Sequence, residues 1–370
     1  MIALDVHVIG ERETGNETYT LNLTRALLAQ AGERSFGLFT PNPDRLPPYL
    51  AQARNARVIA VRPGNSLIRV PFSLPWAVGR AGARLLHVNY VLPPVCPCPG
   101  VATVHDLSYE LFPEDAPPRD RLVLGLLLPL SVRRAAAIIA VSENTRRDLL
   151  RRFAVPDERV SVIYEAAPPH MQRVTDQDSI RQARQTYGLV QPYILAVGNL
   201  QPRKNLARLV EAYAVIRRQG VAAQLVITGQ GRWRESELVR RVQEMGLTRD
   251  VVFTGYVPDS VLPVLYSGAA VFAYPSLYEG FGLPVLEAMT CGAPVVTSNV
   301  SSLPEVAGDA ALLIDPRDVA ALAGALCALL TRPELADDLR ARGYKQAALF
   351  SWQKAAQQTL AVYDRVLGQK

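Results

Sequence analysis

The sequence predicts an α/β protein built from two doubly wound parallel sheets. Short apolar strands alternate with helical segments twice along the 370 residues, and a polar, proline-containing stretch at 165–191 separates the two series. Strands buried on both faces appear as continuous apolar runs, which is the pattern in both series. The chain is also too long for one ordinary hydrophobic core, so two or three domains are expected.

In the first series, strands are expected at 2–8, 36–40, 56–61, 85–88, 101–104, 137–141 and 160–163, with helices at 17–31, 121–134 and 143–153. In the second series, strands are expected at 193–197, 224–228, 251–254, 270–273, 294–297 and 311–314, with helices at 206–219 and 235–245. Ligands bind at the carboxyl ends of strands in such sheets. Functional residues are therefore expected in the loops that follow strands.

The composition is that of a globular protein, because 49% of the residues are hydrophobic and only 20% are charged. The formal charge of +6 rests on arginine, since lysine occurs only at 204, 345, 354 and 370. No stretch interleaves basic and aromatic residues, so no nucleic-acid partner is expected. The first residues lack a signal-peptide pattern and the longest apolar run, 122–130, is too short to span a bilayer, so a cytoplasmic location is expected.

The most informative segment is 275–289, PSLYEGFGLPVLEAM, which follows an apolar strand. Gly280 and Gly282 permit a tight turn and let backbone amides approach a ligand closely. Pro284 suits the first position of a helix, so we expect a helix to begin near Leu283. The free amides and the positive dipole end of that helix form a natural anion site.

Two glutamates, eight residues apart, flank this turn. Glu287 is expected in the first turn of the helix and Glu279 in the loop before it. Carboxylates do not bind phosphate, but they accept hydrogen bonds from sugar hydroxyls. The two glutamates could therefore bind two different sugars, while the backbone amides between them bind the charged group that joins those sugars. In the alternative interpretation Glu279 is a surface loop residue and Glu287 is a helix acid favoured by the dipole. The residues alone leave both interpretations open.

The segment resembles the E-x7-E motif of the family-4, group-1 glycosyltransferases, which have the GT-B fold. Other stretches agree with that family in order and spacing: TVHDL at 103–107, VSENT at 141–145, AVGNLQPRKN at 196–205, VITGQG at 226–231, FTGYV at 253–257, CGAPVV at 291–296 and LPEV at 303–306. The resemblance covers essentially the whole chain, and the C-terminal half is the more specific.

The resemblance implies an organisation into domains. Residues 1–170 are expected to form a Rossmann-like acceptor-binding domain and residues 171–350 a Rossmann-like domain that binds the nucleotide-sugar donor, with a central cleft between them. Residues 351–370 are expected to form a helix that crosses back to the N-terminal domain.

The resemblance also implies roles for individual residues. Glu279 resembles the glutamate that contacts hydroxyls of the transferred sugar, and Glu287 the one that binds the ribose. The candidate catalytic residues are His105, Arg203, Lys204 and Glu279; the candidate donor-binding residues are Gly15, Asn16, Asn199, Gly280, Phe281, Gly282, Leu283 and Glu287.

Arg203 and Lys204 lie in the loop after the strand expected at 193–197, where adjacent cations could neutralise a diphosphate. The alternative is an exposed basic pair before a helix. Relatives often carry an arginine directly after the glycine of this loop, where this chain has Asn199. The charge of the leaving group is therefore expected to rest on Arg203 and Lys204.

Two candidate sites lie in the N-terminal half. His105 ends the strand at 101–104 and resembles the family histidine that lies against the donor sugar, although a lone histidine is usually structural. Gly15 and Asn16 are expected in the loop after the first strand. They resemble a glycine-containing loop that approaches the diphosphate, although the usual run of glycines is reduced here to Gly15.

The resemblance implies transfer of a hexose with retention of the anomeric configuration, with no metal and no other cofactor. No D-x-D metal motif occurs in a suitable loop, so helix-end amides with Arg203 and Lys204 would stabilise the leaving group. Residues 103–114 resemble bacterial mannosyltransferases, which favours mannose from GDP-mannose. UDP-glucose or another UDP-hexose is the alternative donor, and a non-catalytic nucleotide-sugar-binding protein is the alternative of another class.

The resemblance implies that the acceptor is a saccharide or a lipid-linked saccharide, and no sequence motif identifies which one. Residues 121–134 form an apolar helix flanked by arginines, so a peripheral contact with the inner face of the cell membrane and a simple core helix both remain open.

Overall fold

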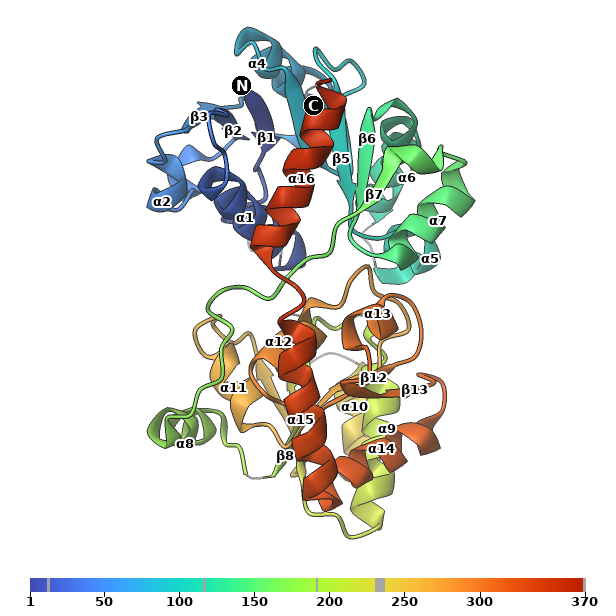
Figure 1. Ribbon diagram of the computed structural model, residues 1–370. Helices are drawn as coiled ribbons and strands as arrows, with labels where there is room; N and C mark the ends of the chain where they lie inside the picture. The colour runs from blue at the N-terminus through green and yellow to red at the C-terminus, as the bar shows by residue number, and fades with distance from the viewer. Residues whose placement is uncertain (12–13, 116–117, 191, 230–236, 369–370) are drawn as a thin grey trace. The chain divides into compact units, whose positions relative to one another are not determined.

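The computed structural model describes residues 1–11, 14–115, 118–190, 192–229 and 237–368. The chain divides into two compact units (Figure 1), of which the first comprises Met1–Ala166 with Ser351–Lys370 and the second comprises Ala167–Phe350. The end of the VITGQG stretch and the start of the helix expected from 235 lie outside the described residues.

The first unit contains a seven-stranded sheet in the order β3-β2-β1-β4-β5-β6-β7, and every neighbouring pair is parallel. The strands are β1 (Ile2–Asp5), β2 (Phe36–Thr40), β3 (Ala56–Ala60), β4 (Leu85–Asn89), β5 (Gly100–Val104), β6 (Ala137–Ala140) and β7 (Val160–Val162). The strand order reverses between β1 and β4, which is the switch point of a doubly wound sheet.

Helices cover both faces of this sheet. They are α1 (Thr14–Ala29), α2 (Pro48–Ala51), α3 (Ser66–Ile68), α4 (Leu74–Arg80), α5 (Ser108–Leu111), α6 (Pro118–Arg134), α7 (Glu143–Phe153) and α16 (Trp352–Val366), with a π-helical turn, η2 (Arg69–Ser73), between α3 and α4. Buried residues of α4, α6 and α7 form one apolar cluster with the central strands. The C-terminal helix α16 packs along α1 (Figure 1).

The second unit contains a six-stranded parallel sheet in the order β10-β9-β8-β11-β12-β13. Its strands are β8 (Tyr193–Val197), β9 (Gln224–Thr228), β10 (Val251–Gly255), β11 (Val271–Tyr274), β12 (Val295–Ser298) and β13 (Ala311–Ile314). Its helices are α8 (Gln177–Tyr187), α9 (Leu206–Arg218), α10 (Glu237–Glu244), α11 (Leu262–Gly268), α12 (Leu283–Thr290), α13 (Leu303–Ala307), α14 (Val319–Thr331) and α15 (Pro333–Ala347). Here the order reverses between β8 and β11.

Local sequence signals explain several helix boundaries. The hydroxyl of Ser142 accepts a hydrogen bond from the amide of Thr145 at 3.0 Å and begins α7. Asp176 caps α8 in the same way, and Gly188 ends that helix with a left-handed φ of 64°. These caps satisfy amides and carbonyls that the helix itself leaves without partners.

The predicted fold class is confirmed, since both sheets are parallel and doubly wound. Two local predictions were wrong. Gly15 and Asn16 lie in the first turn of α1 and not in a loop, because that helix already begins at Thr14. Glu287 lies beyond the first turn of α12, because Gly282 caps a helix that begins at Leu283 and places Glu287 in the second turn.

Across the described residues, no single helix has the length and apolar composition needed to cross a membrane, and only α14 taken together with the segment Pro333–Val366, at a 98° bend, meets both conditions. Within the same residues, no group of three or more His, Cys, Asp or Glu side chains is arranged to hold a metal ion.

Candidate functional site

In the second unit, the candidate residues gather at the carboxyl edge of the sheet where the strand order reverses. The loop after β8 carries Arg203 and Lys204, and the loop after β11 carries Glu279. The two loops are joined through their backbones, since the amide of Leu277 donates to the carbonyl of Arg203 at 2.8 Å. Asn205 also joins them, because its buried side-chain amide donates to the carbonyl of Pro275 at 2.9 Å.

Glu279, Arg203 and Lys204 form one buried ion cluster. Nη1 of Arg203 donates to Oε2 of Glu279 at 2.8 Å, and Nζ of Lys204 donates to Oε1 at 2.7 Å. Lys204 also donates to the hydroxyl of Tyr274 at 2.6 Å. The cation side chains are only 12% and 11% exposed, so the interpretation as an exposed basic pair is wrong. Glu279 is buried as well, so it is not a surface loop residue.

The cluster fixes the charge of Glu279. Burial by itself raises the pKa of a carboxyl, but the charges of Arg203 and Lys204 outweigh it and lower the pKa of Glu279 to about 2. Glu279 is therefore ionised at neutral pH, and the cluster carries two positive charges against one negative charge.

The turn after Glu279 is held by two serines from the loop that follows β12. The Ser301 hydroxyl accepts from the amide of Glu279 at 3.0 Å and donates to its carbonyl at 2.6 Å. The hydroxyl of Ser302 lies 2.6 Å from the carbonyl oxygen of Phe281. Sequence reasoning missed both serines, although they immediately precede the quoted LPEV stretch.

Gly282 meets two conditions that exclude a larger side chain. Its φ is 118°, a left-handed conformation that glycine adopts readily, and a Cβ there would lie 2.9 Å from a methyl carbon of Leu303. Gly282 is the N-cap of α12, and Leu283 and Pro284 follow as the first two helical residues. Pro284 has no N–H group, and the amide of Val285 already donates to the carbonyl of Gly282 at 2.9 Å. An anion at this helix end could therefore use only the amides at and before Leu283.

Glu287 sits in a different environment from Glu279. It is buried on α12 and accepts a hydrogen bond from the hydroxyl of Tyr266 at 2.9 Å. Burial raises the pKa of Glu287 to about 7, although the Tyr266 hydrogen bond lowers it. Glu287 therefore changes charge near neutral pH.

Asn199 lies where two strand-end loops pass closest to each other. It follows Gly198, whose carbonyl oxygen would lie 2.1 Å from a Cβ on Gly229. Asn199 is half-buried at this point. The close approach of the two backbones explains why position 229 carries glycine.

In the first unit, His105 follows β5 and is buried. Its Nδ1 lies 3.0 Å from Oε1 of Glu165, and its Nε2 lies 3.3 Å from Oδ1 of Asn89. The ring of Tyr19 meets the imidazole edge-on, with 4.6 Å between centroids. Sequence reasoning missed Glu165 and Asn89. The available signal was that each follows or ends a strand of the same sheet.

Asn16 belongs to the same network as His105. The carbonyl of Asn16 accepts from the hydroxyl of Thr20 at 2.8 Å, and that hydroxyl accepts from Nδ2 of Asn89 at 2.8 Å. Asn89 in turn faces His105. The structure therefore links Asn16 to His105 through Thr20 and Asn89, and Gly15 is exposed at the start of the helix beside Asn16.

A second carboxylate cluster, also missed from the sequence, lies in the first unit. Asp5, at the end of β1, is buried with Oδ1 3.0 Å from Nδ1 of His7 and Oδ2 2.7 Å from Nη1 of Arg69. Burial raises the pKa of Asp5, but His7 and Arg69 together lower it by more than burial raises it. The pKa of Asp5 is therefore below its ordinary value. Since an ionised Asp5 only accepts hydrogen bonds, Nδ1 of His7 carries a proton and Nε2 is turned away from Asp5.

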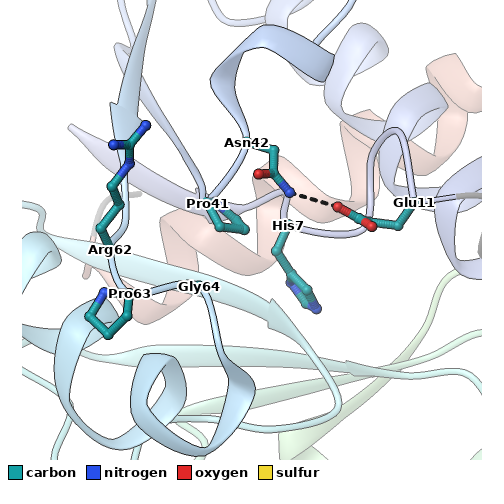
Figure 2. Close-up of a pocket in the computed structure, with 7 residues that line it drawn as sticks. All are labelled: His7, Glu11, Pro41, Asn42, Arg62, Pro63 and Gly64. Carbon is teal, nitrogen blue, oxygen red and sulfur yellow. Dashed lines mark hydrogen bonds between the residues drawn. The ribbon is translucent and has the colours of Figure 1, made fainter.

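The His7 side chain, 28% exposed, lines an open pocket of about 810 Å³. Asn42 and Glu11 are joined by a hydrogen bond of 2.7 Å. Figure 2 shows the His7 side chain below this pair and Arg62 at the left. Pro41, Pro63 and Gly64 complete the wall. The lining is rich in hydrogen-bonding side chains and lies at the carboxyl edge of β1, β2 and β3.

Two family models match the chain. Residues 179–346 match glycosyl transferases group 1, and residues 14–169 match glycosyltransferase family 4. The chain is also 38% identical over 266 residues to O-antigen chain mannosyltransferase B of Escherichia coli, which covers 71% of this chain and 69% of that protein. The chain belongs to this glycosyltransferase family. It is a hexosyltransferase, so a sugar donor and a saccharide acceptor are its substrates.

Other matches agree. Serotype-specific mannosyltransferase WbdA of Escherichia coli is 32% identical over 239 residues, covering 63% of this chain but only 29% of that longer protein. Among solved structures, sucrose-phosphate synthase from Thermosynechococcus elongatus superposes with a TM-score of 0.79 at 26% identity, covering 99% of both chains. The expected GT-B architecture is therefore confirmed.

Proposed function

We propose that the protein is a retaining mannosyltransferase that transfers mannose from GDP-mannose to a saccharide acceptor without a metal ion. The observation that carries the proposal is the buried cluster of Glu279, Arg203 and Lys204 beside the glycine turn that caps α12. The similarity to mannosyltransferases supports mannose as the transferred sugar.

In this proposal, the excess positive charge of the cluster binds the diphosphate. Negative charge develops on the leaving phosphate oxygen as the glycosidic bond breaks, and Arg203 and Lys204 are already fixed by Glu279. Fixed donors stabilise that charge without reorganising. Glu279 then accepts hydrogen bonds from the mannose hydroxyls, and Glu287 accepts them from the ribose.

The contacts of Glu279 also support a front-face mechanism. Both carboxylate oxygens are held by cations, which leaves a poor nucleophile for a covalent intermediate. The incoming hydroxyl attacks on the side of the departing diphosphate, whose oxygen takes the proton. The sugar therefore keeps its anomeric configuration.

We assign the acceptor saccharide to the pocket of the first unit lined by His7, Glu11, Asn42 and Arg62. Its side chains offer both donors and acceptors for sugar hydroxyls, and its volume of about 810 Å³ is in the range of small-molecule sites. His7 is oriented by Asp5, which leaves Nε2 for the acceptor. His7→Ala should raise the KM for methyl α-D-mannoside and leave GDP affinity unchanged.

Nucleotide release tests the proposal. The wild type is incubated with GDP-mannose, UDP-glucose and other GDP- and UDP-sugars in EDTA, with methyl α-D-mannoside as the acceptor, and compared with Glu279→Gln. Release of GDP from GDP-mannose that survives EDTA and falls at least about a hundredfold in the variant supports it. NMR of the product reports whether the configuration is retained.

Two other outcomes would overturn parts of the proposal. Release from a UDP-sugar alone would replace the donor with a UDP-hexose. Tight binding of GDP with no turnover on any acceptor in a saccharide panel would favour a non-catalytic nucleotide-sugar-binding protein.

A further inference from the structure

The charge of the first unit is strongly uneven. Residues 45–105 contain no aspartate or glutamate, and the flanking acids are Asp44 and Asp106. The same stretch contains seven arginines: Arg45, Arg54, Arg57, Arg62, Arg69, Arg80 and Arg84. Arg45 and Arg69 are paired with Glu11 and Asp5. The other five arginines are exposed, and the structure gives them no ion pair among the described residues.

The same stretch presents large apolar side chains to solvent. Phe72 and Trp76 are 68% and 67% exposed, and Ile68 is exposed on the preceding turn. We call Ile68, Phe72 and Trp76 the apolar stripe. The three residues recur at intervals of four across α3, η2 and α4, and each is exposed.

The apolar stripe is not a sign of loose packing. On the opposite side of the same segment, Leu74 and Val78 are fully buried in the core, and Arg69 is anchored to buried Asp5. The segment is thus held firmly to the sheet while its outer side exposes an aliphatic and two aromatic residues. Such a row on a monomer surface marks an interaction site.

A second row of the same kind lies on α6, on the same face of the sheet. Leu122, Leu126 and Leu130 are exposed at intervals of four residues. The inner sides of α4 and α6 share one core cluster. The loop 91–99 joins the two helices, because the amide of Leu92 donates to the hydroxyl of Ser131 on α6 at 2.9 Å. At the other end of that loop, a Cβ on Gly79 of α4 would meet the ring of Pro97 at 3.5 Å.

Arginines border the apolar stripe. The guanidinium of Arg80 lies over the ring of Trp76, 5.5 Å from its centroid, and Arg84 is exposed a turn further on. Arg133 and Arg134 are exposed at the end of α6. Aromatic and aliphatic residues bordered by arginine are the composition of helices that lie in a membrane interface.

We propose that the apolar stripe with Arg80 and Arg84 is a docking surface for an anionic lipid bilayer. Phe72 and Trp76 enter the interface between headgroups and acyl chains, and the arginines contact lipid phosphates. A second copy of the chain is a poorer occupant, because a two-fold contact through this surface would set its arginines against each other, and residues 45–105 contain no acid to pair with them. The proposal does not depend on the donor or acceptor.

Sedimentation with vesicles tests the proposal. Full-length protein is mixed with vesicles of phosphatidylcholine, with or without phosphatidylglycerol, and Phe72→Ser/Trp76→Ser is compared with wild type. We expect wild type to bind only the anionic vesicles and the double variant to bind at least about tenfold more weakly. Tyr49→Ser is the matched control, since Tyr49 is 52% exposed on α2 beneath Arg25 of α1, and it should bind as wild type does.

A second pair of variants tests the charge. Arg80→Gln/Arg84→Gln should weaken binding to anionic vesicles about tenfold, and added salt should reduce the difference. Arg240→Gln in the second unit is the control, because Arg240 is also an exposed arginine, on α10. GDP binding by calorimetry should be unchanged in every variant, which separates this test from the test of the proposed function.

Trp76 gives an independent signal. In a Trp233→Phe background, its fluorescence should shift to shorter wavelength with anionic vesicles, since Trp352 is buried. The proposal is overturned if wild type binds no vesicles or if Tyr49→Ser loses binding equally. It is also overturned if Phe72→Ser/Trp76→Ser dissociates a dimer without changing vesicle binding.

Discussion

Each unit holds one buried carboxylate between two basic side chains, but the partners differ. Glu279 bridges Arg203 and Lys204, whose side chains are buried beside it. Asp5 bridges Arg69, which is buried, and His7, which faces the pocket. The first arrangement concentrates positive charge where a diphosphate is expected. The second orients the His7 ring, which lines the pocket that we assign to the acceptor saccharide. A carboxylate between two basic side chains therefore concentrates positive charge in the second unit and orients a histidine ring in the first.

The largest expected effect is on turnover when the Glu279 cluster is broken. Glu279→Gln keeps the shape but removes the charge that fixes Arg203 and Lys204, so nucleotide release should fall at least about a hundredfold. Stopped-flow measurement of nucleotide release checks this. If Glu279→Gln folds well and turns over normally, the charge of Glu279 is not needed for turnover, and the functional difference between the two clusters is not supported.

Asp5→Ala should act on stability more than on the chemical step. It leaves the guanidinium of Arg69 buried without its carboxylate, which typically costs about 3–5 kcal/mol of unfolding free energy. Urea denaturation measures the loss. His7→Ala is the control, since it removes only the half-exposed partner and should cost less than about 1 kcal/mol. Equal losses of unfolding free energy in the two variants would show that Asp5 stabilises the fold through its contact with His7 and not through its ion pair with Arg69.

Glu287 sharpens the comparison, because it is a buried carboxylate for which the described part of the chain provides no ion pair. Because the pKa of Glu287 is raised from 4.5 to about 7, the folded state holds the proton more tightly than the unfolded state. Its contribution to stability is present below pH 4.5 and is lost as pH rises to about 7, about 3 kcal/mol in all. Thermal denaturation across this range should show the decline, and Glu287→Gln should abolish it. For Glu279, whose pKa is lowered to about 2, the loss runs the other way, as pH falls below 4.5.

Gly282→Ala should have the smallest effect. Its left-handed φ and the approach of Leu303 predict a loss of about 1–3 kcal/mol, together with weaker GDP binding as the turn shifts. Gly125→Ala is the matched control, because that glycine lies within α6 with nothing near its Cβ position. It should gain up to about 1 kcal/mol. If Gly282→Ala changes neither the stability nor the GDP affinity, the turn accommodates the added methyl group.

The strands, several helix ends and one functional turn could be predicted from the sequence, because the residues that specify them are close together in the chain. Continuous apolar runs placed the strands of both sheets to within a few residues, and Ser142 and Gly188 mark helix ends. The turn at 280–282 was also evident, since its glycines and the following proline lie side by side in the chain.

Which side chains form ion pairs and hydrogen bonds with each other was visible only in the tertiary structure. Glu279 lies 76 positions from Arg203, Asp5 lies 64 from Arg69, and His105 lies 60 from Glu165. In a parallel sheet, the loops at one edge meet because of strand order, which spacing along the chain does not reveal. The ionisation of each carboxylate depends on those neighbours and on burial. The sequence by itself therefore determined the strands, some of the helices and the family, and the packing of distant loops decided which charges meet.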